Sequence, residues 1–181
     1  MTKNLLQVKN LTVSTGSEAG KINIVDNISF DIRRGETFVL LGESGSGKSI
    51  TALSIMRLLP VTIKINAGEV ILNDKNLFQL PENKMRKVRG ANIGMIFQEP
   101  QTSLNPVLTA GQQISETLDQ HTNLSNNQCI THSIELLDAV GIPEPERRIN
   151  EYPHQFSGGM KQRIMIAIAL AGEPDLLIAD E

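Results

Sequence analysis

Residues 37–49 read TFVLLGESGSGKS and join an apolar run to a glycine-rich loop. The run, residues 37–41, is continuous, as is typical of a parallel strand that is covered on both faces. After the loop, apolar side chains recur at helical spacing at Ala52, Leu53, Met56 and Leu59. The stretch therefore predicts a strand, a glycine-rich turn and a helix in succession, which is typical of an α/β fold with a parallel sheet.

The loop matches the pattern GxxxxGK[ST] in full, which is typical of loops that hold nucleotide phosphates. Glycines let backbone N–H groups turn inward around the phosphates, and the positive end of the following helix adds to the attraction. We expect Lys48 to contact the phosphate oxygens and Ser49 to offer its hydroxyl to Mg²⁺. A chance match is expected in roughly one chain in a hundred of this length, so a glycine turn without function is the weaker explanation. The predicted phosphate-binding residues are Gly42, Glu43, Ser44, Gly45, Ser46, Gly47, Lys48 and Ser49.

A second apolar run, residues 176–179, is followed by Asp180 and Glu181. An aspartate at the end of a neighbouring strand can help to hold Mg²⁺, and a following glutamate can orient and deprotonate the attacking water. On its own, the pair reads more readily as a solvated strand end. Together with the glycine loop it indicates ATP hydrolysis, with Asp180 as a metal ligand and Glu181 as the catalytic carboxylate.

Residues 156–160, FSGGM, resemble the signature motif of the ABC ATPases, which is usually written LSGGQ. Phe and Met stand in its first and last places, whereas Ser157, Gly158 and Gly159 are intact. A serine and two glycines at the start of a helix form a second anion site, although the serine alone reads as an ordinary helix N-cap. Because the motif follows a phosphate loop and lies 23 positions before Asp180, the resemblance favours the signature.

Gln98 follows the apolar run 93–97 and lies 50 positions after Lys48. It resembles the Q-loop glutamine of the same family, which contacts Mg²⁺ or the attacking water, so it is predicted both as a metal ligand and as a catalytic residue. The resemblance covers essentially the whole chain and narrows to the ATP-binding subunits of peptide and nickel importers. The stretches that carry it are residues 42–49, 95–100, 102–106, 152–160 and 177–181.

This resemblance implies a P-loop NTPase core with a mostly parallel sheet, an N-terminal antiparallel β part and an inserted α-helical subdomain. We expect the nucleotide-binding core in residues 1–98, the helical insert in residues 99–157, and the signature helix with the last strand in residues 158–181. The middle helices are expected around Ile114 and Leu118 and after an N-cap at Ser125.

The resemblance also implies partners. Two such ATPase domains, identical or different, meet head to tail, so that ATP on one phosphate loop is capped by the signature motif of the other. Two membrane permeases bind the pair at the cytoplasmic face of the inner membrane, and an extracytoplasmic solute-binding protein acts indirectly. Residues 102–106, TSLNP, lie in the region that faces the permease by resemblance, although a proline-stiffened turn explains them equally well.

The chain departs from the family pattern in two places. Many relatives stack adenine on an aromatic residue near the first strand, but residues 13–16 contain none, so the adenine-contacting residue is not identified. The family also continues past the Asp-Glu pair with a D-loop and a switch histidine, and none of His121, His132 and His154 fits that role. We therefore expect the 181-residue chain to be inactive alone.

Composition limits the alternatives. The chain has 181 residues, 40% of them hydrophobic, which is enough to form the hydrophobic core of a domain. Its net charge of −3 does not indicate the basic surface that nucleic-acid binding requires. One cysteine, Cys129, cannot form an internal disulfide.

A soluble ABC-type ATPase acting on DNA or ribosomes is the main alternative, but the 59 positions between Gln98 and Ser157 leave no room for the long coiled-coil inserts of DNA-repair relatives. A plain P-loop kinase or GTPase is disfavoured by the signature and the Asp-Glu pair. The sequence does not name the solute, because selection lies in the partners.

Overall fold

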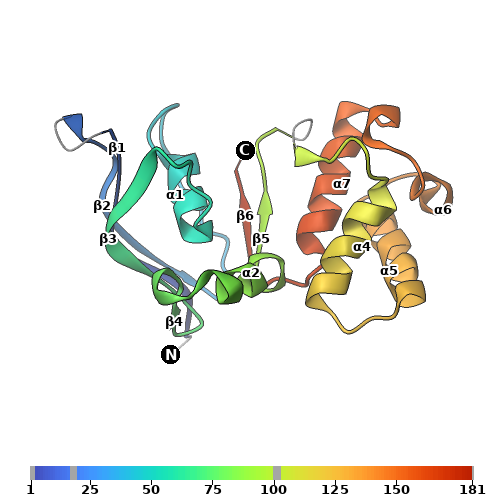
Figure 1. The fold of residues 1–181 in the computed structure, drawn as a ribbon, viewed down its shortest axis with the longest axis horizontal. Helices are drawn as coiled ribbons and strands as arrows, with labels where there is room; N and C mark the ends of the chain where they lie inside the picture. The colour runs from blue at the N-terminus through green and yellow to red at the C-terminus, as the bar shows by residue number, and fades with distance from the viewer. Residues whose placement is uncertain (1–2, 17–19, 100–102, 181) are drawn as a thin grey trace. The chain divides into compact units, whose positions relative to one another are not determined.

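The computed structural model describes residues 3–16, 20–99 and 103–180. These residues form two compact units, residues 1–85 and 86–181. Each unit has its own sheet: four antiparallel strands in the first and two parallel strands in the second (Figure 1). Helix α2 (Glu82–Ala91) runs across the boundary between them.

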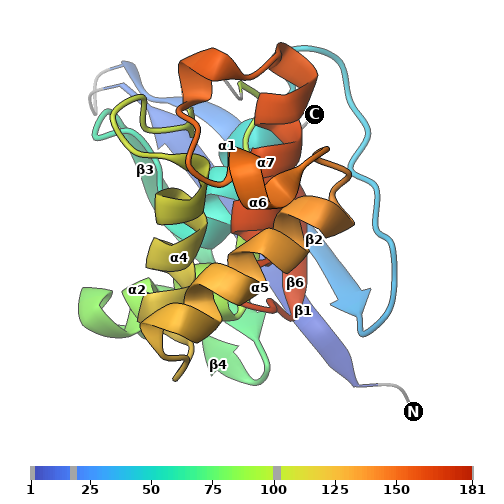
Figure 2. The same cartoon turned by 90° about the vertical axis from the view of Figure 1, so that its right-hand side faces the viewer.

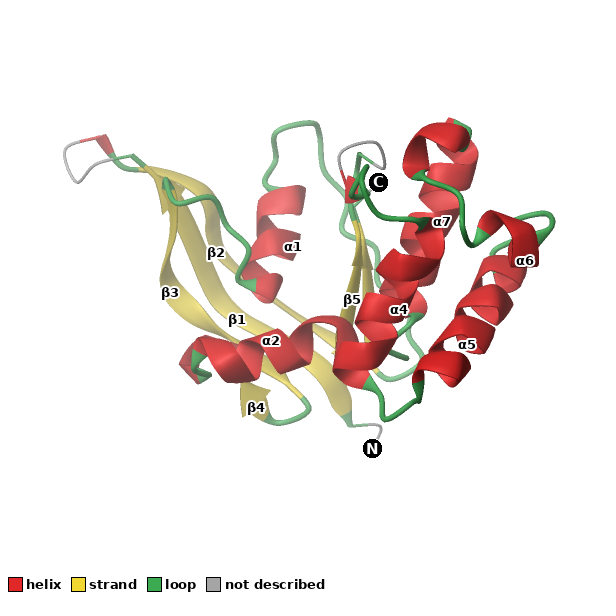
Figure 3. Cartoon of the chain, turned by 45° about the vertical axis from the view of Figure 1, so that its right-hand side comes forward, coloured by secondary structure: helices red, strands yellow, loops and turns green. Residues whose placement is uncertain are grey.

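The antiparallel sheet of the first unit has the strand order β2-β1-β3-β4. Its strands are β1 (Asn4–Thr15), β2 (Ile22–Arg33), β3 (Ile63–Leu72) and the short β4 (Lys75–Asn76). Strand β1 lies in the middle and supplies much of the core, since Leu6, Val8, Leu11 and Val13 are all buried. Helix α1 (Lys48–Met56) lies beside this sheet, and buries Ile55 and Met56 (Figure 3).

Residues 37–41 correct one expectation of the sequence analysis. The apolar run was predicted to be a buried parallel strand, but in the described part of the chain no strand pairs with it. Val39 and Leu41 are 65% and 87% exposed, and Phe38 makes its ring contact with Phe30 of β2 at a centroid distance of 4.9 Å. An apolar run becomes a buried strand only where neighbouring strands and covering elements supply the pairing, and here none does.

The second unit combines a small parallel sheet with a helical core. Strands β5 (Ile93–Ile96) and β6 (Leu176–Ala179) pair in parallel, with Ile93 opposite Leu176 and Ile96 opposite Ala179. Helices α4 (Ala110–His121), α5 (Asn126–Ala139) and α7 (Gly158–Leu170) pack against one another, and the short α6 (Pro145–Arg148) follows α5 (Figure 2). The helical core includes Leu104, Ile114, Leu118, Leu137, Ile142, Phe156 and Ile164.

Local signals set the helix boundaries. Thr109 begins α4 and Ser125 begins α5, each in a capping box with the glutamine three residues later. Helix α2 ends in a kink at Arg89 and Gly90, where Gly90 has φ +91°, and the chain then turns into β5.

The predicted fold class is confirmed: the chain is α/β, with an antiparallel N-terminal part and a group of helices placed between β5 and β6 in the sequence. The expected division at residues 98 and 157 stays a prediction. Among the described residues, no helix combines the length and the apolar character needed to cross a membrane.

Candidate functional site

The glycine loop leads directly into α1 and leaves the start of that helix without a side-chain cap. Gly45 and Gly47 have φ values of +81° and +92°, a left-handed backbone that favours glycine. The N-cap of α1 is Gly47, which has no side chain to cap the helix, and no acidic residue lies in the first turn. The first N–H groups and the positive end of the helix are therefore suited to an anion.

The side chain of Lys48 is held over the loop by backbone carbonyl groups of the loop. Its Nζ atom donates hydrogen bonds to the carbonyl oxygens of Gly42 at 2.7 Å and Glu43 at 2.9 Å. The loop is closed further by the N–H of Ser46, which donates to the carbonyl of Glu43 at 3.1 Å. The ammonium group is thus placed at the loop, and phosphate oxygens would be alternative acceptors for it.

Gly47 is fixed by close packing as well as by its backbone angle. A Cβ atom built on it would lie 2.8 Å from the carbonyl oxygen of Ile24 and 3.2 Å from Cγ2 of Val25, both on β2. The carbonyl of Gly47 accepts from both the N–H and the hydroxyl of Thr51. The loop is therefore anchored to the antiparallel sheet through Gly47.

The signature residues lie at the start of α7 in the second unit. Ser157 is the N-cap, and its Oγ atom accepts a hydrogen bond from the N–H of Met160 at 3.3 Å. Phe156 just before it is buried in the helical core and fixes the entry to the helix. The ordinary N-cap is thus present, and the Ser157 hydroxyl proton can still be donated to an acceptor outside the helix.

Neither the packing nor the backbone conformation of the described residues requires glycine at positions 158 and 159. Both are exposed, neither has a positive φ, and a Cβ atom built on either would meet nothing within 4 Å. Glycine in a helix is less favourable than alanine by about 1 kcal/mol. Two glycines that lower helix stability without a local reason suit a surface that a ligand or another chain approaches closely.

Gln98 and Asp180 lie at one edge of the parallel sheet. Gln98 follows β5 by two residues and Asp180 follows β6 by one, and the two strands end side by side. The N–H of Asp180 donates to the carbonyl of Ile96 at 3.0 Å, which continues the pairing up to the carboxylate. The carboxyl edge of parallel strands is where ligands of α/β proteins bind.

The oxygen donors suit Mg²⁺ brought in by a nucleotide. Among the described residues, no three His, Cys, Asp or Glu side chains lie close enough together to hold a metal by themselves. Mg²⁺ does not require such a cage, because it keeps several waters and binds through one or two protein oxygens plus phosphates. Ser49 in the first unit, and Gln98 and Asp180 in the second, offer a hydroxyl, an amide oxygen and a carboxylate.

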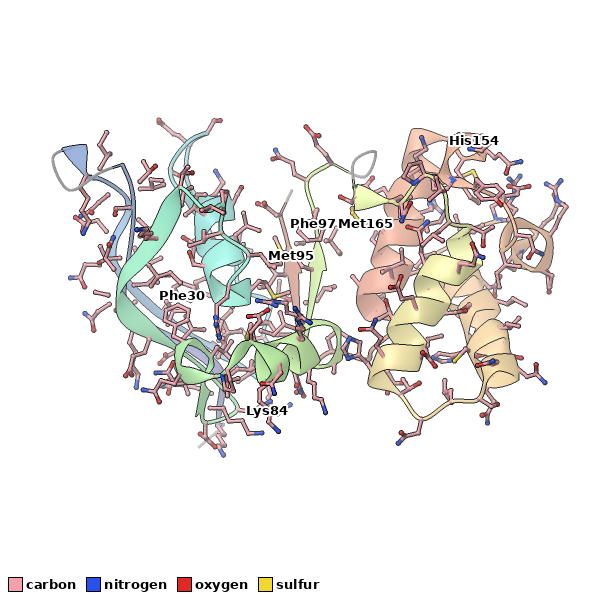
Figure 4. The ribbon with its side chains drawn as sticks, viewed as in Figure 1. Phe30, Lys84, Met95, Phe97, His154 and Met165 are labelled. Carbon is pink, nitrogen blue, oxygen red and sulfur yellow. The ribbon has the colours of Figure 1, made fainter. Side chains whose placement is uncertain are left out.

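Helix α7 is held within its unit at both ends. Near its start, Nη1 of Arg163 donates to the carbonyl oxygens of Val140 at 3.0 Å and Gly141 at 2.8 Å, at the end of α5. Near its end, Gly94 of β5 lies so close to the carbonyl of Ala169 that a Cβ atom would clash. Met95 on β5 and Met165 on α7 are both buried (Figure 4). The sequence analysis missed Arg163, because an exposed arginine on a helix carries no signal without its tertiary partners.

The predicted site residues belong to both units. The phosphate loop belongs to the first unit, whereas Gln98, Asp180 and the signature belong to the second. Glu181 lies outside the described residues, as does Thr102 of the TSLNP stretch. The three histidines lie on α4, on α5 and in the turn η3 (Pro153–Gln155) before α7, upstream of Asp180 as the sequence indicates.

Comparison with known proteins identifies the family. The sequence model described as "ABC transporter" matches residues 25–181, which is most of the chain. The chain belongs to the ABC transporter family. It is 48% identical over 178 residues to the oligopeptide transport ATP-binding protein OppD of Bacillus subtilis, and 49% identical over 180 residues to the dipeptide transport ATP-binding protein DppD of the same organism. These matches cover 98% and 99% of this chain but 50% and 54% of the relatives, so the chain spans about half their length.

Solved structures of ABC transporter cassettes have the same fold. The ATP-binding cassette MJ0796, in a dimeric post-hydrolysis state bound to ADP and Pi, superposes with a TM-score of 0.86 at 31% identity, covering 97% of this chain and 73% of that one. A second dimeric structure of MJ0796, a bacterial ABC transporter cassette, gives a TM-score of 0.85 at the same identity. The resemblance to peptide importers noted in the sequence is therefore confirmed at the level of the family and of its peptide transport members.

Proposed function

We propose that this chain is the ATP-binding and ATP-hydrolysing subunit of an ABC importer for peptides or a related solute such as nickel. The observation that carries the proposal is the phosphate loop: a full GxxxxGK[ST] match whose lysine is held over the loop and whose helix start has no side-chain cap. The names of the relatives, OppD and DppD, support peptides as the solute.

In this proposal each predicted residue has one role in the hydrolysis of Mg-ATP. The backbone of residues 42–47 and the ammonium of Lys48 bind the β- and γ-phosphates. Ser49, Gln98 and Asp180 hold Mg²⁺, and Gln98 also orients the attacking water. Glu181 accepts the proton of that water, so that the attack on the γ-phosphate leaves ADP and inorganic phosphate.

The signature provides the contact between two ATPase domains. Ser157, Gly158 and Gly159 of one domain cap the γ-phosphate bound to the other, which agrees with the open space around the two glycines. Because this contact exists only with ATP bound, hydrolysis releases it, and the closed state is lost by a shift of population. The dimeric MJ0796 structure with ADP and Pi supports such an assembly.

Two permease subunits of the inner membrane are the further partners. The chain acts from the cytoplasmic face as a peripheral subunit, and an extracytoplasmic binding protein delivers the solute to the permeases. The names of the relatives as transport ATP-binding proteins support this placement. A soluble ATPase acting on DNA or ribosomes has no observation in its favour.

Peptide uptake in the source organism tests the proposal. Disruption of the gene is expected to abolish uptake of labelled di- and oligopeptides, with rescue by the wild-type gene and none by the Lys48→Ala variant. A Lys64→Ala variant, altered on the exposed part of β3, is the matched control and is expected to restore uptake. Undiminished uptake of peptides and of nickel in the disrupted strain contradicts the transport function.

A further inference from the structure

We propose that Arg57 is a positioning residue for nucleotide binding, because it fixes the far end of the helix whose start binds phosphate; this rests on the proposed function. Arg57 directly follows Met56, the last residue of α1. It lies beyond the GxxxxGK[ST] pattern, which ends at Ser49. The motif therefore gives Arg57 no role, and the evidence for one comes from its backbone and from its side-chain contacts.

The backbone of Arg57 is left-handed, a conformation in which glycine is usual at the end of a helix. Its φ and ψ angles are 53° and 43°, and a residue with a side chain is strained there. The N–H of Arg57 donates to the carbonyl of Ser54 at 3.0 Å and that of Leu58 to the carbonyl of Leu53 at 2.9 Å, so the end of α1 is closed. Glycine would close the helix with less strain, so arginine is favoured here only if its side chain supplies an interaction of its own.

The guanidinium group of Arg57 supplies that interaction. Its Nη1 atom donates to the carbonyl oxygens of Leu77 at 3.1 Å and Leu80 at 2.6 Å, and its Nη2 atom lies 3.7 Å from Oε2 of Glu82. Leu77 is buried and the Arg57 side chain is 25% exposed, so water screens these contacts less than those of a surface ion pair. Residues Leu77–Gln79 form the turn η2, and Glu82 begins α2. One side chain therefore joins the end of α1 to the segment that leads into α2.

Helix α1 is thus fixed at both ends. At its start, Gly47 packs on Ile24 and Val25 of β2, and at its end Arg57 binds the carbonyls of the segment before α2. The N–H groups suited to a phosphate belong to the loop and the first turn, and those of the turn point along the helix axis. A helix whose axis is fixed presents these donors in one direction and loses less conformational entropy when phosphate binds.

Two variants of Arg57 separate the positioning of the helix from its contribution to stability. Arg57→Gly and Arg57→Ala both remove the guanidinium group, but only glycine adopts the left-handed backbone without strain. Arg57→Gly is therefore expected to unfold at a higher urea concentration than Arg57→Ala. In calorimetric titrations of the full chain, both are expected to bind Mg-ATP equally weakly, about threefold to tenfold more weakly than wild type. Amide exchange at Leu58 is expected to be about fivefold faster in both.

A conservative variant and a control complete the set. Lysine keeps a charged donor on a flexible stem but lacks the planar fork of arginine, so Arg57→Lys is expected to recover part of the lost affinity. Lys84→Ala removes an exposed cation from α2 and leaves the contacts of Arg57 in place. It is expected to match wild type in its affinity for Mg-ATP and in amide exchange at Leu58.

The outcomes separate the inference from the function it rests on. Wild-type affinity in Arg57→Gly overturns the positioning role. An affinity that follows the order of the urea midpoints also overturns it, because stability alone then explains the binding, and so does a lysine variant that recovers nothing. Where Arg57→Ala does not fold, Arg57→Gly and Arg57→Lys decide. A wild-type chain that binds no Mg-ATP contradicts the proposed function instead, and exchange at Leu58 then still decides whether Arg57 fixes the end of α1.

Discussion

Glycine serves two different purposes at the candidate site. At Gly47 the backbone is left-handed and a Cβ atom would press on the carbonyl of Ile24, so the fold itself requires glycine. At Gly158 the backbone is ordinary and the space around it is open among the described residues. The first glycine is required by packing, whereas nothing among the described residues requires the second.

The two glycines are therefore expected to respond differently to alanine. Gly47→Ala should lower the free energy of unfolding by about 1–3 kcal/mol, through positive-φ strain and the contact with Ile24. Gly158→Ala should leave stability unchanged or slightly higher, because alanine is the better helix former. Urea denaturation measures both. A large loss of stability in Gly158→Ala is inconsistent with this reading.

Glu181 is assigned as the catalytic carboxylate. Glu181→Gln keeps the shape and hydrogen-bonding capacity of the side chain but removes the base, so binding of Mg-ATP is expected to stay within about twofold while turnover falls by about 10²–10⁴. Phosphate release is measured in the assembled complex, with Glu173→Gln, an exposed change before β6, as control. Normal phosphate release by Glu181→Gln rules this residue out.

At the scale of elements, the sequence was most informative where a pattern is self-contained. The bounds expected for β6 agree with those observed, and the N-caps Ser125 and Ser157 begin α5 and α7. Residues 37–41 differ because composition shows that a run is apolar but not whether neighbouring strands will pair with it. Arg163 could not be found from the sequence, since its partners are the backbone carbonyls of Val140 and Gly141, which only the tertiary fold brings near it.

The link between α7 and α5 gives a prediction for Arg163. Arg163→Ala removes the hydrogen bonds to the carbonyls of Val140 and Gly141, and is expected to lower the free energy of unfolding by about 0.5–1.5 kcal/mol. Arg147→Ala is the control, because its side chain is exposed and its ion pairs with Glu144 and Glu151 are each worth less, typically about 0.2–1 kcal/mol. Thermal and urea unfolding distinguish the two. An Arg163→Ala variant as stable as wild type contradicts the proposed link.

Stability of the whole molecule is expected to depend on pH through His121. Burial lowers the pKa of the His121 side chain below its ordinary value near 6.5, and the ring packs on the kink of α2, where a Cβ atom on Gly90 would lie 2.5 Å from Nε2. The unfolded chain therefore binds the proton more readily than the folded one. The stabilising contribution is complete above about pH 6.5 and is lost as the pH falls toward the folded pKa.

His121→Gln is expected to make the free energy of unfolding less sensitive to pH between about pH 7.5 and 5.5. Urea denaturation at several pH values gives the slope for wild type and variant. Equal slopes show that His121 does not contribute to the acid sensitivity.

The candidate site could be predicted from the sequence where its chemistry is local. The phosphate loop and the signature each occupy a few consecutive residues, and their structures have the helix starts that the motifs predict. The pairing of β5 with β6, which brings Gln98 and Asp180 to one sheet edge, joins segments about 80 residues apart and is not contained in either segment alone. Assembly of the whole site from the two units stays a prediction.

Calorimetric titration of Mg-ATP into the wild-type chain and into Lys48→Ala tests the central claim most directly. Wild type is expected to bind one nucleotide, and removal of the ammonium is expected to weaken binding by about one to two orders of magnitude, since hydrogen bonds to charged groups contribute about 1.5–3 kcal/mol. Lys64→Ala serves as the control and should bind as wild type does. Equal affinity of wild type and Lys48→Ala would contradict the claim that this loop grips the phosphates of ATP.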